Sequence, residues 1–190
     1  MANLRQTPLT CSGHTRPVVH LAFSDVTECG YFLISACKDG KPMMRQGDTG
    51  DWIGTFEGHK GAVWGVALNP QASKAATGAA DFNAKVWDAV SGEVLHSFQH
   101  NHIVKSVNFS SNSSLFVTGS NEKLIKIFDL NKPDAGCCEQ AFVCAEPQVF
   151  SGHTSGIRHV LFFRDDTHLV SCADDRTLRV WDISSGKVRD

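Results

Sequence analysis

The chain has 190 residues, of which 42% are hydrophobic and 20% charged, and its formal net charge is −2. These values are typical of a globular domain, and they give no basis for an electrostatic grip on bulk nucleic acid. We expect no membrane span and no signal peptide, since no apolar run approaches the required length. The seven scattered cysteines are odd in number, which favours a reducing, intracellular compartment.

The predicted elements are short strands that recur in one order after each of four histidines. Residues 4–11 are predicted to form a lone outer strand ahead of them. First strands are predicted at 18–23, 62–68, 103–109 and 157–163, and second strands at 32–36, 74–78, 115–119 and 168–172. Third strands are predicted at 84–88, 124–129 and 178–182, and a fourth strand, as at 92–98, leads into the next histidine. No segment shows a helical period of useful length.

The repeat is marked by short dipeptide motifs. Gly-His occurs at 13–14, 58–59 and 152–153, and Trp-Asp occurs at 87–88 and 181–182. The aligned histidines, His14, His59, His100 and His153, lie 45, 41 and 53 residues apart. This period, with four short strands per unit, predicts an all-β fold, a β-propeller of the WD-repeat kind.

Two units contain a complete set of four polar residue types. The sets are His59, Thr77, Asp81 and Trp87 in the second unit, and His153, Ser171, Asp175 and Trp181 in the fourth. An indole N–H, a hydroxyl, an imidazole and a carboxylate can form one continuous hydrogen-bond chain. We interpret each set as a structural tetrad that satisfies polar groups inside an apolar blade.

The same residue types admit a catalytic alternative, an Asp-His-Ser triad. A hydrolase triad needs an attackable hydroxyl beside an oxyanion hole. Here the tryptophan N–H is expected to hydrogen-bond to the hydroxyl, and the set recurs in two units. The sequence therefore favours a protein that is not an enzyme, with no catalytic residue and no cofactor.

The other two units contain partial tetrads. The first has His14, Ser35 and Asp39, with Arg45 at the tryptophan position. The third set consists of His100 and Thr118, with Glu122 replacing aspartate and Phe128 replacing tryptophan. Phenylalanine keeps the packing and loses the donor, so we expect these blades to depend more on apolar contacts.

Partner binding is expected on the face shared by the Gly-His loops and the turns between second and third strands. The candidates there are Arg16, Lys38, Lys60, Phe82, His102, Lys123 and Arg176. Each is also consistent with an ordinary solvated side chain. Phe82 is favoured because an apolar ring gains little in a turn. Cys137, Cys138 and Cys144 lack a second pair at ligand spacing, so no metal site is predicted.

The units predict about four blades of an expected seven, at 14–56, 59–98, 100–150 and 153–190, within one partial propeller spanning 1–190. In closed propellers of this kind an N-terminal outer strand completes the last blade, which is absent here. Two interblade faces would remain uncovered. We therefore expect a truncated product, a partial gene model or a chain that needs a partner, with a compact four-bladed ring as the alternative.

Several segments go beyond the generic repeat, namely residues 6–19, 31–43, 45–56, 84–92 and 151–157. With these segments the chain resembles the serine-threonine kinase receptor-associated family of WD-repeat scaffolds. The resemblance implies a seven-bladed, non-catalytic propeller in the cytoplasm and nucleus. Three further repeats and an acidic tail of that family are missing here, and residues 134–145 are an insertion relative to it.

The resemblance also implies partners and a role. Family members belong to the survival-of-motor-neuron complex, which assembles spliceosomal small nuclear ribonucleoproteins, and they contact a Gemin subunit there. They also damp transforming-growth-factor-β signalling by stabilising the association of the type I receptor kinase with an inhibitory Smad. The expected partners are therefore proteins, with RNA associated only indirectly. The alternatives are the WD-repeat subunit of translation initiation factor three and a non-functional truncated product.

Overall fold

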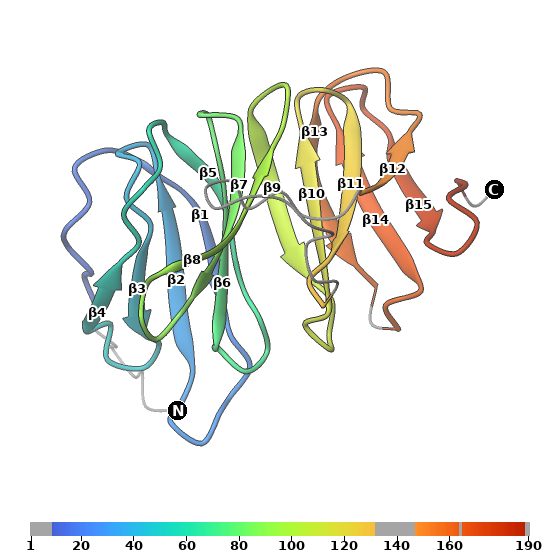
Figure 1. The fold of residues 1–190 in the computed structure, drawn as a ribbon. Coiled ribbons are helices and arrows are strands. Elements are labelled where there is room, and N and C mark those ends of the chain that lie inside the picture. Colours follow the sequence, from blue (N-terminus) through green and yellow to red (C-terminus); the bar gives the residue numbers. More distant parts are fainter. Residues whose placement is uncertain (1–8, 132–146, 164, 189–190) are drawn as a thin grey trace, which may run out of the picture.

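The computed structural model describes residues 9–131, 147–163 and 165–188, and in these the chain forms fifteen strands and no helix (Figure 1). No helix long and apolar enough to cross a membrane occurs among them. Of the outer strand predicted at 4–11, residues 9–11 form no strand and the rest lies outside the described residues. The insertion at 134–145, with its three cysteines, also lies outside them.

The strands form four antiparallel sheets in chain order, which we call blades 1 to 4. Blade 1 contains β1 (Val18–Phe23), β2 (Phe32–Cys37), β3 (Met43–Gln46) and β4 (Trp52–Thr55). Blade 2 contains β5 (Val63–Leu68), β6 (Lys74–Ala79), β7 (Asn83–Asp88) and β8 (Val94–Gln99). Blade 3 contains β9 (Val104–Phe109), β10 (Leu115–Ser120), β11 (Leu124–Asp129) and β12 (Gln148–Ser151). Blade 4 contains β13 (Ile157–Phe162), β14 (His168–Ala173) and β15 (Leu178–Asp182).

The blades stand side by side as an open fan, and the described sheets do not close a ring (Figure 1). The first strands of successive blades contact one another, β1 with β5, β5 with β9 and β9 with β13. We call the end with the Gly-His loops and the turns from second to third strands the upper face, after its position in Figure 1. The all-β propeller fold predicted from the repeat is confirmed, as four blades of an incomplete ring.

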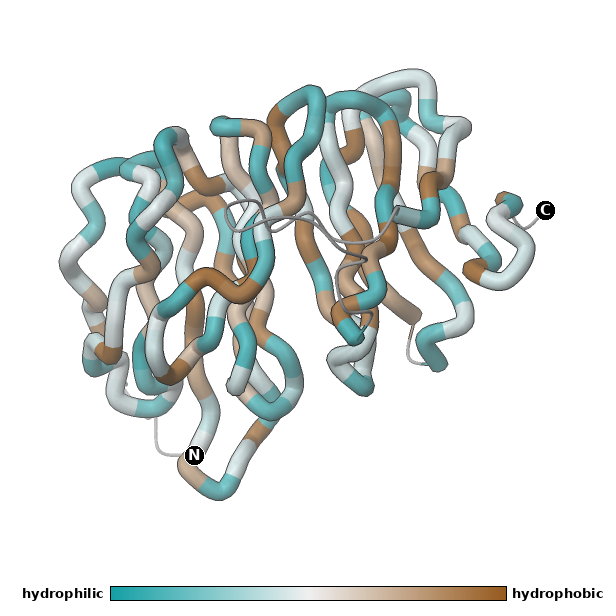
Figure 2. Tube along the Cα trace, in the orientation of Figure 1, coloured by the Kyte–Doolittle hydropathy of each residue, from teal (hydrophilic) through white to brown (hydrophobic). Residues whose placement is uncertain are grey.

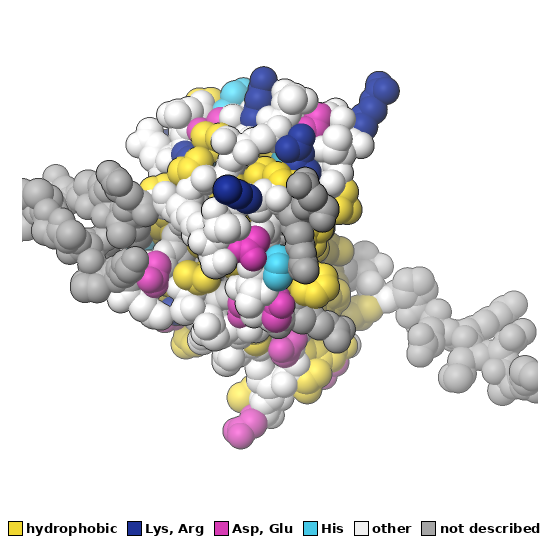
Figure 3. Space-filling view, turned by 90° about the vertical axis from the view of Figure 1, so that its right-hand side faces the viewer, with side chains coloured by type: hydrophobic (Ala, Val, Ile, Leu, Met, Phe, Trp, Pro, Cys, Tyr) yellow, Lys and Arg dark blue, Asp and Glu magenta, His cyan; other side chains and the backbone are white. Residues whose placement is uncertain are grey.

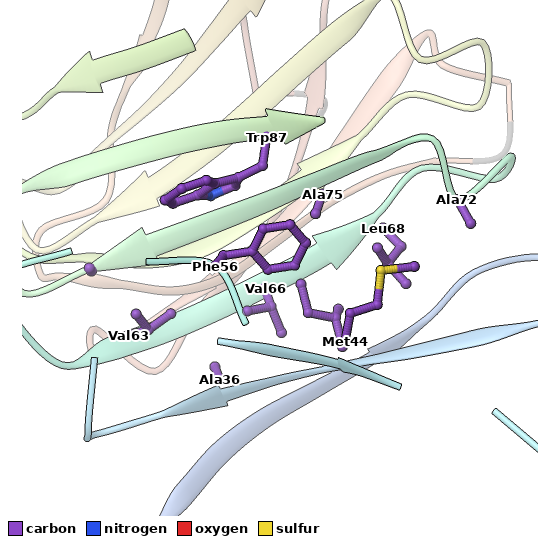
Figure 4. Packing of buried hydrophobic residues seen from close by; sticks show 11 residues of the cluster. Ala36, Met44, Phe56, Val63, Val66, Leu68, Ala72, Ala75 and Trp87 are labelled. Atoms are coloured by element: carbon purple, nitrogen blue, oxygen red, sulfur yellow. The ribbon is translucent and has the colours of Figure 1, made fainter. Parts of the chain in front are cut away.

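The core consists of three apolar clusters, one between each pair of neighbouring blades. Between blades 1 and 2, the rings of Phe56 and Trp87 lie 5.5 Å apart, with Met44, Val66 and Leu68 around them (Figure 4). The other two clusters enclose Phe128 and Trp181 in the equivalent position. Figure 2 shows that hydrophobic segments follow the strands and hydrophilic ones the loops at both ends. Stability therefore comes from blade-to-blade burial of apolar surface.

Glycine in the second strand permits the closest approach of two blades. A Cβ on Gly78 would lie 2.8 Å from Val104 Cγ1, and one on Gly119 would lie 2.6 Å from Ile157 Cγ2. Both distances are shorter than a normal carbon contact, so a side chain would push the blades apart. In blade 4, Cys172 takes this position.

The outward flanks of blades 1 and 4 are apolar and uncovered by the described residues. Leu21 and Phe23 are 54% and 56% exposed, whereas their counterparts in blade 2, Val66 and Leu68, are 1% and 8% exposed. On the other flank, Leu178 is 67% exposed. The exposed residues of each flank occupy positions whose equivalents in the other blades are buried against a neighbouring blade.

Each blade has a β-bulge at the same place, the second residue of its first strand. The pairing of first with second strand shifts register between Val18 and His20, and equivalently in the other three blades. The bulge residues are Val19, Trp64, Lys105 and Arg158. A bulge leaves one residue unpaired and re-aims its side chain.

Candidate functional site

The tetrad of blade 2 forms a continuous hydrogen-bond chain from the core to the upper face. The Trp87 indole N–H donates to Thr77 Oγ1 at 2.8 Å, and Thr77 Oγ1 lies 2.6 Å from His59 Nε2. His59 Nδ1 lies 2.8 Å from Asp81 Oδ2, which also accepts the Lys60 amide N–H at 2.9 Å. Because Trp87 donates to the hydroxyl, the hydroxyl proton is free to bond His59, and the remaining imidazole N–H bonds the carboxylate.

The tetrad of blade 4 repeats this arrangement. Trp181 Nε1 donates to Ser171 Oγ at 2.8 Å, and the same oxygen lies 2.8 Å from His153 Nε2. His153 Nδ1 lies 2.8 Å from Asp175 Oδ2. The chain links the Gly-His loop to the strands, so it fixes the loop above each blade.

In blade 1 an arginine replaces the tryptophan and binds elsewhere. His14 bonds both Ser35 Oγ, at 2.7 Å, and Asp39 Oδ2, at 3.0 Å. The buried Arg45 guanidinium donates to the carbonyl oxygens of Gly50 and Ser12 instead of to Ser35. Arg45 thus holds the segment that precedes the blade.

In blade 3 the residues of the partial tetrad form only part of the hydrogen-bond chain. His100 Nδ1 lies 2.8 Å from Glu122 Oε1, which also pairs with Lys126 Nζ at 2.9 Å. Thr118 Oγ1 donates to the Lys126 carbonyl oxygen at 3.4 Å, and His100 Nε2 is buried without a partner among the described residues. Phe128 offers no N–H to the threonine, so nothing directs the Thr118 hydroxyl proton toward the imidazole.

The carboxylates of these sets are held in the ionised form. Burial alone would raise the pKa of Asp81, but hydrogen bonds from His59 and from the Lys60 and Asn83 amides outweigh it and lower that pKa to about 2. For Glu122, burial is outweighed by hydrogen bonds from His100 and Lys126, and its pKa is also lowered to about 2. Both groups are therefore charged acceptors throughout the physiological range.

The hydroxyls of the full tetrads are buried, Thr77 at 0% and Ser171 at 1% exposure. Each already accepts an indole N–H and bonds an imidazole. A nucleophile must instead be reachable by a substrate. The geometry is that of a structural hydrogen-bond chain.

One described group has three potential metal ligands, His14, Cys37 and Asp39, with ligand atoms within 4.8 Å of one another. Cys37 donates to the Arg16 carbonyl oxygen, and Asp39 Oδ1 accepts the Lys41 amide. Burial raises the pKa of the Cys37 thiol, which opposes the thiolate that a metal needs. The group is accounted for by its own hydrogen bonds.

The structure brings the candidate binding residues together on the upper face, in two kinds of position. Arg16, Lys60 and His102 lie in the loops that enter the first strands. Lys38, Phe82, Lys123 and Arg176 lie in the turns from second to third strands. The Phe82 ring is 41% exposed and lies 5.7 Å from the His102 ring.

Three of these turn residues adopt a left-handed backbone conformation. The φ angles are 67° for Phe82, 69° for Lys123 and 64° for Arg176, and blade 1 has Gly40 there at 81°. Glycine adopts this conformation freely, whereas other residues pay roughly 1–2 kcal/mol. The backbone of this turn thus favours glycine, yet three blades have a large side chain there.

Charge is separated between the two ends of the blades. Seen from the side of blade 4, Lys and Arg gather in the upper part of the molecule and Asp and Glu mainly in the lower part (Figure 3). The lower turns contain Asp25, Glu28, Asp48, Asp51, Asp88, Glu93, Asp165, Asp166 and Asp182. The near-neutral chain therefore has a basic upper face.

Sequence reasoning missed four side chains that lie beside this face, Trp64, Lys105, Arg158 and Asp174. The first three are bulge residues, and Asp174 pairs with two of them. A signal was present, because residues 19, 64, 105 and 158 share no apolar character although the residue before each is apolar. This signal was not recognised because a β-bulge is defined by the pairing of two strands, which the sequence of one strand does not reveal.

Four-stranded antiparallel blades, with His-Ser/Thr-Asp-Trp chains linking strands to loops, define a WD-repeat propeller protein. The family model described as "WD domain, G-beta repeat" matches residues 50–88, 92–129 and 145–182, and the chain belongs to this family.

Among individual proteins the chain is similar to the serine-threonine kinase receptor-associated protein. It is 64% identical over 182 residues to that of Gallus gallus, covering 96% of this chain and 49% of the relative. For the Homo sapiens protein the identity is 63% over 179 residues, 94% of this chain and 48% of the relative. Eukaryotic translation initiation factor 3 subunit I of Drosophila mojavensis is 32% identical over 181 residues, 92% of this chain and 54% of the relative. The chain spans about half the length of these curated relatives.

Proposed function

We propose that this chain is a non-catalytic scaffold whose protein partners dock on the upper face. The observation that carries the proposal is the occupancy of the left-handed turn position by Phe82, Lys123 and Arg176. Small or polar residues, Ala72, Ser113 and Asp166, adopt the same conformation in the lower turns, whereas the upper turns present large side chains that a partner could contact. The exposed Phe82 ring, which lies beside the His102 ring, has the character of an interface anchor.

The partners proposed are those of the similar receptor-associated proteins. They are a Gemin subunit of the survival-of-motor-neuron complex, the type I receptor kinase and an inhibitory Smad. The corresponding roles are spliceosomal small nuclear ribonucleoprotein assembly and negative regulation of transforming-growth-factor-β signalling, in cytoplasm and nucleus, with RNA associated indirectly. Support comes from the 64% identity, and the relatives' name itself describes association with a receptor kinase.

The second candidate is the role of the initiation factor subunit, favoured by its 32% identity over most of the chain. Affinity purification on the tagged chain separates the two. Capture of Gemin proteins and the receptor kinase supports the proposal, and capture of small ribosomal subunits supports the alternative. If the chain captures neither set of partners, the scaffold role is contradicted.

The docking face is tested in the same purification with one variant and a matched control. Phe82→Ser removes the exposed ring from the upper face, and we expect about a tenfold loss of captured partner. Val90→Ser is the control, because Val90 is 90% exposed and lies in a turn at the opposite end. Equal capture by the Phe82→Ser variant and the wild type would place docking elsewhere. A serine-directed fluorophosphonate probe should leave Ser171 unlabelled.

A further inference from the structure

The bulge residues of the four blades surround one place at the inner edge of the upper face. His20 and His159, each one residue beyond a bulge, have ring centroids 5.5 Å apart although they belong to blades 1 and 4. The four first strands therefore converge, and their bulge residues lie around the point of convergence. The turn residues Lys38 and Asp174 also contact bulge residues. We call Lys38, Trp64, Lys105, Arg158 and Asp174 the bulge cluster.

The fold does not dictate the identity of the bulge residues. The position before the bulge is apolar in all four blades, Val18, Val63, Val104 and Ile157, and the last three are 0% exposed. The bulge position itself holds valine, tryptophan, lysine and arginine. A position that varies while its neighbours repeat is not fixed by the repeated apolar pattern, so it can serve recognition.

The bulge cluster is rich in hydrogen-bond donors and positive charge. Lys38 Nζ lies 5.2 Å from the Trp64 ring centroid, a cation–π contact. Arg158 Nε donates to Asp174 Oδ1 at 2.5 Å, and Lys105 Nζ lies 3.9 Å from Asp174 Oδ2. Asp174 thus pairs with two cations, Lys105 and Arg158, and Lys38 has no carboxylate partner in the cluster. Burial and the neighbouring Arg158 lower the pKa of Lys105, although Asp174 opposes this, which is consistent with a positive charge that is not fully neutralised.

The cluster also contains a donor that lacks an acceptor. The Trp64 indole N–H is buried and bonds to nothing among the described residues. Buried donors are rarely left unpaired, because each costs about 1–3 kcal/mol. Lys38 lies over the same ring on a flexible stem, so an anion that draws Lys38 aside also uncovers the indole.

From this geometry we infer that the bulge cluster binds an acidic peptide segment of a protein partner, whose carboxylates pair with Lys38, Lys105 and Arg158. Carboxylates supply the acceptors and the negative charge that the cluster lacks. A single-stranded nucleic acid fits less well, since successive bases stack on several aromatic side chains and the cluster contains one, Trp64. The inference rests on the proposed scaffold role and names the chemistry of one partner.

The experiment titrates the purified chain with a fluorescein-labelled oligoglutamate peptide and follows anisotropy. An oligoglutamine peptide of the same length and a labelled oligouridine strand are the comparison probes. We expect saturable binding of oligoglutamate, weakened about fivefold or more in Lys38→Gln and in Lys105→Gln. Lys187→Gln removes the same charge from a lower turn and is the matched control, with less than about twofold effect. Trp64→Phe keeps an aromatic ring, removes the indole N–H and should also weaken binding.

The outcomes are decisive in either direction. Binding that weakens equally in Lys187→Gln and Lys105→Gln reflects overall charge and overturns the inference. Tighter binding of oligouridine than of oligoglutamate, or no saturable binding of either, overturns it as well. Circular dichroism of each variant shows whether the fold is intact.

Failure of this inference is separable from failure of the scaffold proposal. The peptide titration needs no cellular partner, so it reports on the bulge cluster even if affinity purification captures nothing. Conversely, undiminished capture of the Gemin or receptor partner by Lys105→Gln, together with unchanged peptide binding, rejects the cluster and leaves the scaffold role standing.

Discussion

The Trp87 indole N–H donates to the Thr77 hydroxyl at 2.8 Å, and this bond decides how the rest of the tetrad is oriented. With its acceptor site filled, the hydroxyl directs its proton to His59. In blade 3, where Phe128 has no such donor, Thr118 turns to the Lys126 carbonyl and His100 Nε2 has no partner among the described residues.

Trp87→Phe should therefore destabilise the fold by about 1–3 kcal/mol, because it strands the buried hydroxyl while keeping most of the packing. Urea denaturation followed by circular dichroism measures the change. Trp52→Phe is the control, since Trp52 is 60% exposed, and its effect should be within about 0.5 kcal/mol. Equal stabilities of the two variants would contradict a stabilising role for the tetrad.

Gly119→Ala should destabilise the interface of blades 3 and 4 by about 1–3 kcal/mol, since the new methyl would meet Ile157 Cγ2 at 2.6 Å. Thermal or chemical unfolding gives the value. Gly54→Ala is the matched control in a strand, because a Cβ there meets nothing within 4 Å. If both variants unfold like the wild type, the blades are not in close contact at Gly119.

Arg176→Gly should raise stability by about 0.5–1 kcal/mol, because glycine relieves the left-handed conformation at φ 64°. Lys60→Gly, in a loop residue without positive φ, should lower stability by about 0.5–1 kcal/mol through the flexibility of the unfolded chain. The comparison uses denaturant midpoints at equal slope. A loss of stability in Arg176→Gly would show that the side chain contributes more than its backbone costs.

Stability should fall as the pH drops below about 6.5, where histidine normally takes up a proton. Burial lowers the pKa of His100 from 6.5, although Glu122 opposes this, and burial together with His159 lowers that of His20. A depressed histidine pKa means that the folded state binds fewer protons, so its contribution is complete above 6.5 and is lost below it. Unfolding at about pH 7.5 and about pH 5.5 tests this.

His100→Asn retains a donor toward Glu122 and removes the titrating ring. It should reduce the loss of stability between the two pH values without abolishing it, because the pKa of His20 is still lowered by burial. Glu122 stays ionised across this range because its pKa is about 2. A pH dependence identical to that of the wild type would assign the effect to other groups.

The sequence is sufficient to predict four sheets and to name the members of both full tetrads, because strand length, turn chemistry and tetrad spacing are local properties repeated along the chain. It does not indicate the third strand of blade 1, β3, since Met43, Arg45 and Gln46 give no apolar alternation. The hydrogen bonds of Arg45 could not be predicted either, because one of them goes to Ser12, which only the fold brings beside Arg45.

The partial tetrad of blade 3 shows a different limit. The residue types at His100, Thr118, Glu122 and Phe128 suggest a chain shortened by one donor. The consequence of that missing donor, a hydroxyl that bonds backbone instead, depends on competing acceptors whose distances no spacing encodes. The bulge cluster could not be predicted from the sequence for a related reason. Its residues come together through register shifts, and these arise from pairing between strands.

The repeated β-bulge has a consequence for engineering and evolution. Each blade carries a different side chain at one structurally equivalent position, so the same backbone frame presents four different groups. Exchanging Arg158, whose side chain is 55% exposed, together with its partner Asp174 would therefore change recognition at one bulge while the apolar residue before it stays packed.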